Sequence, residues 1–521
     1  MDVSAFQQQL QNMMSGGGNA MNGSMGGTMA EFEELTKALQ ASNYQTDVAT
    51  LEQGGALGVQ SLDTAMKTVI QENEHFVLFN RLAQSNAINI VDEYSRQNSI
   101  GGWLGGSTNT QMGVVRAAQG EYKREVGFVK FLMTLRQVGY VLNIGKNIAE
   151  PVAVEERNGA LQLLTDANYL LYHGNSAASP TQYDGVLTIL EDALANDEIP
   201  SENVQDMNGK ALDSIDAMSK VQTSVASYGS WGNSTDIFLP FSVQHDLNMN
   251  LDAAYRWTPQ GQNTPVIGGQ VDGIRLTKGV LRTNVDTFIQ DETNPMVKPF
   301  EATNRDLANT PDLVNIKPQS VDTTAIAAAN TPRSNFSGTR KGDYIYAVSA
   351  IDANGKGYSP ITVSHKNGAA AMTAVTVAER GSVEVKIMHS AQGTETGYAI
   401  YRSRQIDANN PNPGADAEGY RLVKVIKKSG GNHTVFVDAN FDIPGTVSVP
   451  LLNMTAGADA IGWRQFQPMT KIPLPFGVGG MPVMSWFQFL FGYLRVTKPK
   501  HHGFIKNILP HGATWRPHTG E

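Results

Sequence analysis

The chain has 521 residues, a formal net charge of -9, no cysteine and 17% charged residues, against roughly 25% in typical globular proteins. Its length predicts two or three domains, the missing cysteines exclude disulfides and thiolate chemistry, and the acidic balance argues against a dedicated nucleic-acid-binding domain. Sparse charge suits a loop-rich protein that hides surface against copies of itself, and it equally suits a secreted carbohydrate-binding protein.

Residues 1–85 predict an N-terminal arm. Residues 1–30 are rich in Met, Gly, Asn and Gln and almost uncharged, which is typical of a flexible segment. Residues 31–85 carry short helical patterns of apolar residues. The start of the chain has neither a basic beginning nor an apolar run, so we expect no signal peptide.

Residues 86–142 predict a long β-hairpin. Its first strand is expected to open at Ile88, and four glycines around Trp103 indicate a loose tip. Residues 126–142 then alternate with a period of two and favour the returning strand, so that the hairpin extends from about Asp92 to Leu135. Such a projection cannot bury its own faces, so it needs a partner surface.

The clearest helix is predicted over residues 150–173, within a region that spans residues 143–213. Pro151 suits a first-turn position, and Glu155 and Glu156 complement the positive end of the helix dipole. Gly174 supplies a stop. At 1.5 Å per residue this helix would be about 36 Å long, enough to cross a whole domain.

The following segment, to about residue 300, has the mixed pattern of an α/β region. Ser214–Ser227 is expected to be helical, Asp236–Pro240 a buried strand, and a further helix is expected to start near Ser242. Residues 301–340 show repeated Asn, Thr, Ala and Pro with little periodicity, and we expect a linker there.

Residues 341–447 predict a separate all-β domain. Six or seven short alternating strands follow one another, and Asn354-Gly355 marks a turn. This pattern is typical of an immunoglobulin-like or fibronectin type III sandwich. Residues 344–359, YIYAVSAIDANGKGYS, resemble a fibronectin type III strand with its following turn.

One stretch imitates a membrane span. Phe476–Leu494 contains only two polar residues in 19, which as a helix would suit about 30 Å of hydrocarbon. Pro473, Pro475 and Pro482 argue against a helix, and the aromatic second half is typical of buried strands. We expect a buried strand pair and no membrane contact.

No catalytic, cofactor-binding or metal site is predicted. The chain lacks a phosphate-binding GxxxxGK[ST] loop, an HExxH helix and a GxSxG elbow. Adjacent His501 and His502 would lie on opposite faces of a strand, so a shared metal is disfavoured and they are interpreted, with His511 and His518, as surface or interface histidines. Asp246 beside His245 is interpreted as a solvated helix start.

Two further patterns have ordinary interpretations. The four Asn-x-Ser/Thr triplets after residue 200 are attributed to chance, since glycan attachment needs a secreted eukaryotic context; they begin at Asn233, Asn335, Asn432 and Asn453. The mildly basic tail fits a solvated edge or a surface facing packaged DNA; its cations are Lys498, Lys500, Lys506 and Arg516.

The order of these elements resembles the major capsid protein of tailed double-stranded DNA bacteriophages, whose shell fold is shared with herpesvirus capsids. Three passages carry the resemblance: LLYHGNSAASPTQYDGVL from Leu170, DIFLPFSVQHDL from Asp236 and FLFGYLRVTKPKHHGFIKNI from Phe489. It covers residues 30–320 and 450–510. Inserted immunoglobulin-like domains occur in this family, commonly on the outer surface.

The resemblance implies an α+β capsid fold with an arm (1–85), a hairpin loop (86–142), a peripheral domain (143–213) with a spine helix (150–173), an axial domain (214–325), an all-β insertion (326–449) and a returning core (450–521). It implies a structural virion protein and not an enzyme. Copies would form hexamers and pentamers around double-stranded DNA that they contact non-specifically, with scaffolding and portal proteins and an optional decoration protein, after assembly in the host bacterial cytoplasm.

Covalent crosslinking, known in some members, is not predicted, because no matched Lys and Asn pair is evident.

Two other classes of protein stay open as alternatives. A tail tube, sheath or fibre component would lack a long helix after a long hairpin, and a secreted glycan-active enzyme with a fibronectin-like module would need an export signal and a carboxylate pair.

Overall fold

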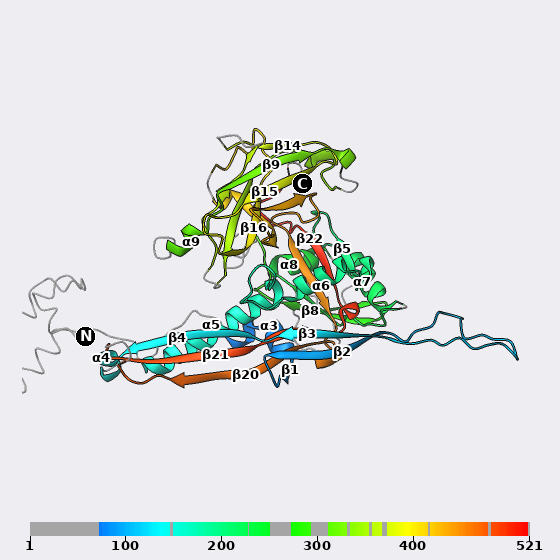
Figure 1. The fold of residues 1–521 in the computed structure, drawn as a ribbon, viewed down its shortest axis with the longest axis horizontal. Coiled ribbons are helices and arrows are strands. Elements are labelled where there is room, and N and C mark those ends of the chain that lie inside the picture. The colour runs from blue at the N-terminus through cyan, green and yellow to red at the C-terminus, as the bar shows by residue number, and fades with distance from the viewer. Residues whose placement is uncertain are drawn as a thin grey trace, which may run out of the picture. The chain divides into compact units, whose positions relative to one another are not determined.

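The computed structural model describes residues 72–145, 150–227, 229–250, 272–292, 311–330, 334–353, 357–366, 372–414, 417–477 and 481–518. Most of the predicted N-terminal arm therefore lies outside the described residues. Helices and strands alternate irregularly along the chain, so the α+β class is confirmed (Figure 1).

A long four-stranded sheet carries the main helix on one face. Its strand order is β1-β20-β21-β4, with β1 at Ala83–Asn86, β20 at Ile461–Pro473, β21 at Val483–Val496 and β4 at Lys130–Gly139. Helix α5, Pro151–His173, runs along this sheet (Figure 1). Its start at Pro151 and its end before Gly174 are as predicted, because both signals are local to the helix ends.

The predicted hairpin is present, but it is shorter than expected. Strands β2 (Val91–Ser99) and β3 (Glu121–Phe128) form a separate two-stranded antiparallel sheet. The prediction that residues 130–142 continue the hairpin is wrong: β4 leaves it to pair with β21, and α4 (Tyr140–Ile144) is helical. The first strand also begins at Val91 and not at Ile88.

A six-stranded sheet of order β5-β22-β19-β6-β8-β7 holds the rest of the main core. Its central strands come from both sides of the β-domain in sequence, which makes that domain an insertion. The strands are β5 (Val204–Asp206), β22 (Gly503–Ile508), β19 (Val447–Leu452), β6 (Asp236–Leu239), β8 (Gly279–Val285) and β7 (Gly273–Leu276), and the helices are α3 (Val77–Arg81), α6 (Val186–Ala195), α7 (Asp216–Ala226) and α8 (Phe241–Asn250). The predictions for α7, β6 and α8 are confirmed.

The inserted β-domain contains two four-stranded sheets around a common core. One has the order β12-β11-β16-β17, with strands at Thr362–Val363, Tyr346–Asp352, Glu395–Ser403 and Tyr420–Lys427. The other has the order β13-β9-β15-β18, with strands at His365–Lys366, Ser320–Ile326, Ser382–Met388 and His433–Asp438. Strands β10 (Gly342–Tyr344) and β14 (Val375–Val377) form a small third sheet, and α9 covers Pro311–Asn315.

The linker expected over residues 301–340 is wrong in part, because β9 belongs to the second of these sheets and pairs along its whole length with β15. Its sequence, SVDTTAI, gives a weak strand signal because most of its residues are polar. The Asn354-Gly355 turn lies outside the described residues. An immunoglobulin-like strand order stays a prediction, as do the domain boundaries.

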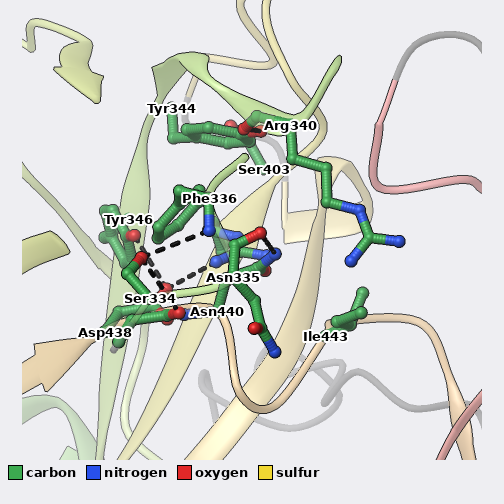
Figure 2. A network of polar contacts seen from close by, with 12 residues as sticks. Ser334, Asn335, Phe336, Arg340, Tyr344, Tyr346, Ser403, Asp438, Asn440 and Ile443 are labelled. Carbon is green, nitrogen blue, oxygen red and sulfur yellow. Dashed lines mark hydrogen bonds and ion pairs between the residues drawn. The ribbon is translucent and has the colours of Figure 1, made fainter. Parts of the chain in front are cut away.

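A buried arginine organises the interior of the β-domain. The Arg402 side chain has no exposed surface and donates to an Asp438 carboxylate oxygen at 2.6 Å. Its guanidinium lies 5.1 Å from the ring centres of both Phe336 and Tyr344. Tyr346 donates to the same carboxylate at 2.8 Å, so Asp438 joins strands of both sheets, as Figure 2 shows.

Replacing Arg402 with Met is expected to destabilise the β-domain by about 3–5 kcal/mol, because it leaves the buried Asp438 charge without its cation. This loss is measured as a shift in the urea concentration at which the backbone amides of the β-domain lose half of their protection from hydrogen exchange. Lys427→Met, on an exposed position of β17, is the matched control and should leave the midpoint unchanged. An equal effect of both variants would contradict the assigned role of Arg402.

Candidate assembly surfaces

One face of the four-stranded sheet is apolar, and the described residues leave it uncovered. Residues on β4 alternate, so that Thr134 and Arg136 point toward α5 and bond to Gln162. The opposite side chains form the sheet outer face, defined as Phe131, Met133, Leu135, Ile472, Phe487, Phe489 and Phe491, which cross-strand register brings to one side. Ring contacts of 4.9 Å between Phe131 and Phe491 and 4.8 Å between Phe489 and Phe491 join them into one patch.

These side chains remain exposed within a single copy. Met133 is 64% exposed, Leu135 52% and Ile472 48%. Single exposed apolar residues are common on protein surfaces, whereas a contiguous aromatic patch marks an interaction site. The expected buried strand pair is wrong in part: Phe476–Leu494 contributes one strand, β21, which pairs with β20, and the buried side chains are those that alternate with the sheet outer face, such as Trp486 and Leu490.

The hairpin tip, defined as residues 100–120, is a second uncovered apolar segment. Met112 is 97% exposed, Val114 91% and Ile100 87%. The tip has a defined backbone: Gly101 has φ +79°, and a Cβ there would lie 2.0 Å from the Gln119 carbonyl oxygen. The glycine at this position is thus required by the close approach of the two sides of the tip.

Polar contacts attach the base of the hairpin to the body. Asp92 of β2 accepts two hydrogen bonds of 2.9 Å from the Arg464 guanidinium and one of 2.6 Å from the Tyr493 hydroxyl. Arg495 lies 3.4 Å from the same carboxylate. Burial alone would raise the pKa of Asp92, but the Arg464 and Tyr493 hydrogen bonds outweigh it and hold the pKa below its ordinary value.

A second attachment lies further along the hairpin. Arg96 of β2 donates to Glu198 at 2.9 Å, and Lys123 of β3 bonds to the same carboxylate. Glu198 follows α6, so this contact joins both hairpin strands to the body. Burial works against ionisation of Glu198, but its bonds from Lys123 and Arg96 lower its pKa overall.

Acid is expected to release the hairpin base. Because the pKa values of Asp92 and Glu198 are lowered by folding, their stabilisation is present above the ordinary carboxyl pKa of about 4 and is lost as the pH falls through the lowered values. At neutral pH, Asp92→Asn should lower hydrogen-exchange protection in β2 by about tenfold or more, which corresponds to the loss of charged hydrogen bonds of about 1.5–3 kcal/mol.

Glu93→Gln is the control for this prediction. Glu93 occupies the next position on β2, faces away from the body and makes only an exposed ion pair with Arg124. It should leave β2 protection unchanged. If the β2 amides exchanged as fast in the unaltered chain as in the Asp92→Asn variant, Asp92 would have no role in holding the hairpin.

Two of the histidines predicted as surface or interface groups are buried. His502 is fully buried and accepts a 3.1 Å hydrogen bond from the Asn453 amide, and burial lowers its pKa to about 3. His518 is also buried, against Tyr344. The surface interpretation is wrong for these two, and His501 ends a short 3-10 turn instead of lying on a strand. In the part of the chain that the structure describes, no three His, Asp or Glu side chains are grouped to hold a metal.

Asp246 is not the solvated group that the sequence predicts. It is buried, and one of its carboxylate oxygens accepts a 2.8 Å hydrogen bond from the His511 amide, whereas His245 is exposed. In the basic tail, Lys506 donates to the Phe441 carbonyl at 3.1 Å and lies 3.5 Å from Asp442, so it belongs to an internal contact. Of the four asparagine triplets, Asn453 lies in a buried position.

Neither the sheet outer face nor the attachments of the hairpin base could be located from the sequence. The sequence shows the alternation of Phe131, Met133 and Leu135, but it does not show which side of the strand α5 covers.

Among the described residues, no helix is long and apolar enough to cross a membrane.

Comparisons with known proteins give only distant structural likenesses. No family model matches the chain, and no curated protein matches it. Among solved structures, it is similar to the encapsulin complex of Synechococcus elongatus PCC 7942, with 9% identity over 91% of this chain and 99% of that chain and a TM-score of 0.35.

Phage capsid proteins are also among these neighbours. The capsid of a native GTA particle has 9% identity over 89% of this chain and 100% of that chain, with a TM-score of 0.34. The major capsid proteins of phage G, solved with decoration proteins, have 7% identity over 89% and 99%, with a TM-score of 0.38. Values this low do not assign a function, so the function proposed next rests on this chain's own residues.

Proposed function

We propose that this chain is the shell-forming subunit of an icosahedral virus particle, whose copies assemble into hexamers and pentamers around double-stranded DNA. The observation that carries this proposal is that the described residues leave two different apolar surfaces, the hairpin tip and the sheet outer face, uncovered on one copy, while most apolar side chains of the body are packed. Assembly, and not turnover, is the activity.

The two surfaces favour a ring over a simple dimer. The hairpin tip differs from the sheet outer face, so a contact in which one copy's tip covers the next copy's face is head-to-tail. A head-to-tail contact repeats from copy to copy and closes into a ring when the rotation allows it. Rings of five and six copies are the closed units from which an icosahedral shell is built.

The energetics suit an assembly of many contacts. Burying one large apolar side chain contributes roughly 1.5–3 kcal/mol, so a patch of this kind offers on the order of 10 kcal/mol. Association costs about 4–15 kcal/mol, which leaves a single contact marginal. A copy that touches several neighbours gains from effective concentration, so the closed particle becomes durable although each pair is weak.

The remaining parts of the proposal concern partners and location. The chain acts in the virion, after assembly in the host bacterial cytoplasm, with scaffolding and portal proteins and an optional decoration protein. Its net charge of -9 argues against a dedicated DNA-binding domain, so its contact with the packaged DNA is proposed to be non-specific. The β-domain is proposed to lie on the outer surface.

Electron microscopy of the purified, overexpressed chain tests this function. Closed polyhedral particles or hexameric sheets are expected. A homogeneous monomer at high concentration, under conditions in which the hydrogen-exchange pattern shows a fully folded chain, would contradict it.

A further inference from the structure

The C-terminal residues 510–518 leave the body and end inside the β-domain. This segment, the C-terminal clasp, follows β22, the second strand of the six-stranded sheet. It is tied to the body at its start, where the His511 amide donates to Asp246 of α8. Its end is tied to the β-domain, where the Gln405 amide donates to the Pro517 carbonyl at 2.9 Å.

Trp515 is the anchor of the clasp. It is 3% exposed, and two guanidiniums lie near its ring, those of Arg404 at 5.4 Å and Arg421 at 5.1 Å from the ring centre. Gly445 lies directly against the ring, since a Cβ there would be 2.5 Å from it. A buried tryptophan close to two cations combines apolar burial with cation–π attraction.

The anchor is connected to the body by charge. Arg421 of β17 binds the Glu292 carboxylate with two hydrogen bonds of 2.6 and 2.7 Å, and both side chains are buried. Beyond Trp515, His518 packs against Tyr344 of β10, with its Nδ1 3.0 Å from the hydroxyl. The clasp therefore contacts three separate strands or strand ends of the β-domain.

The rest of the junction between the β-domain and the body combines polar contacts with a cavity. Arg340 bonds to Asn208, and the Thr396 hydroxyl donates to the Ala178 carbonyl at 2.6 Å. A cavity of about 440 Å³ also lies there, lined by residues of the body and of β17, among them Tyr169, Thr188, Asp192, Leu422 and Val425. Beside it, Lys424 lies 3.4 Å from Glu191 in an ion pair whose side chains are both about 40% exposed, so this pair fixes the orientation of the β-domain only weakly.

We propose that the C-terminal clasp is a built-in latch, a segment that holds the β-domain in one orientation on the body. The β-domain surface around Arg404, Arg421 and Tyr344 then recognises the Trp-Arg-Pro-His sequence of the clasp as a peptide. An inserted domain is connected to its host by two chain crossings, and a third crossing that is anchored at both ends restricts its rotation further. This inference is independent of shell assembly, since every contact lies within one copy.

Distances between two spin labels test the latch. The chain has no cysteine, so Thr324→Cys on β9 and Lys220→Cys on α7, both exposed, give one label on each part. Excess unlabelled chain restricts the signal to distances within a copy. The unaltered clasp should give a narrow distribution, and Trp515→Ala should broaden it at least twofold. Thr514→Ala is the matched control, because the Thr514 side chain is exposed and only its carbonyl accepts a bond, from Arg404.

Cleavage after folding removes the ambiguity of a variant that fails to fold. A protease site introduced at exposed Gly512 can be cut in the purified chain, and the distribution should then broaden as the released peptide leaves. A synthetic peptide covering Pro510–Glu521 should restore the narrow distribution, and the same peptide with Ala in place of Trp515 should not. A distribution that stays narrow after cutting, or one that the intact peptide does not restore at millimolar concentration, would overturn the proposal.

Discussion

Removal of Ile100–Gly120, with a two-residue Asn-Gly turn joining Ser99 to Glu121, is expected to abolish closed particles while leaving a folded chain. The two ends are adjacent, because Ser99 and Glu121 are register partners in the hairpin, and Asn-Gly suits a tight hairpin turn. The deleted segment contributes nothing to the main core but carries the most exposed apolar side chains of the hairpin. Electron microscopy and sedimentation should show small species in place of shells.

A second variant separates the loss of apolar contact from the loss of length. Changing Met112, Val114 and Val115 to Ser keeps every tip glycine and the full chain length. We expect it to reduce assembly nearly as strongly as the deletion, with an unchanged thermal midpoint. Normal particles from the deletion would remove the hairpin tip from the mechanism, and normal particles from the triple substitution alone would assign the role to the tip backbone.

Charge placed on the sheet outer face is expected to have the second large effect. Met133→Glu combined with Phe487→Glu puts two carboxylates at neighbouring strands of the patch, where covering by another copy would desolvate them. Loss of about 3 kcal/mol or more per contact lowers an association constant by a factor of about 100 or more. Particle yield should fall below detection at concentrations where the unaltered chain assembles.

Gln137→Glu is the matched control for these two substitutions. Gln137 is exposed on the same strand as Met133, and its replacement adds one carboxylate beyond the apolar patch. This control should assemble with near-normal yield, and both variants should unfold at the same urea concentration as the unaltered chain. Equal loss of assembly in the control would mean that net charge, and not the sheet outer face, governs the result.

Local signals predicted local features well. Pro151 and Gly174 bound α5 as expected because capping depends on residues within one turn, and alternation located β11, β15 and β16 in the β-domain. The boundary between hairpin and sheet was missed at Phe128, since the departure of β4 depends on β21, which lies more than 340 residues later in the chain. No window of sequence contains both partners.

The polar attachments were missed for the same physical reason. Asp92 reads as an ordinary strand residue, and its partners Arg464 and Tyr493 follow 372 and 401 residues later. The burial of His502 and His518 likewise depends on the β22 register and on the clasp, neither of which leaves a local signature. The exposure of the sheet outer face could not be predicted either, because alternation shows that the two faces differ but not which of them α5 covers.

Crosslinking between two singly labelled populations tests the head-to-tail contact most directly. One population carries Leu104→Cys in the hairpin tip, the other Met133→Cys in the sheet outer face, and a short bismaleimide is added to the mixture. We predict a tip-to-face product between two copies, and none when Thr324→Cys replaces Met133→Cys. A chain carrying both cysteines that crosslinks only within itself at every concentration, with its hairpin folded onto its own sheet, would contradict the account.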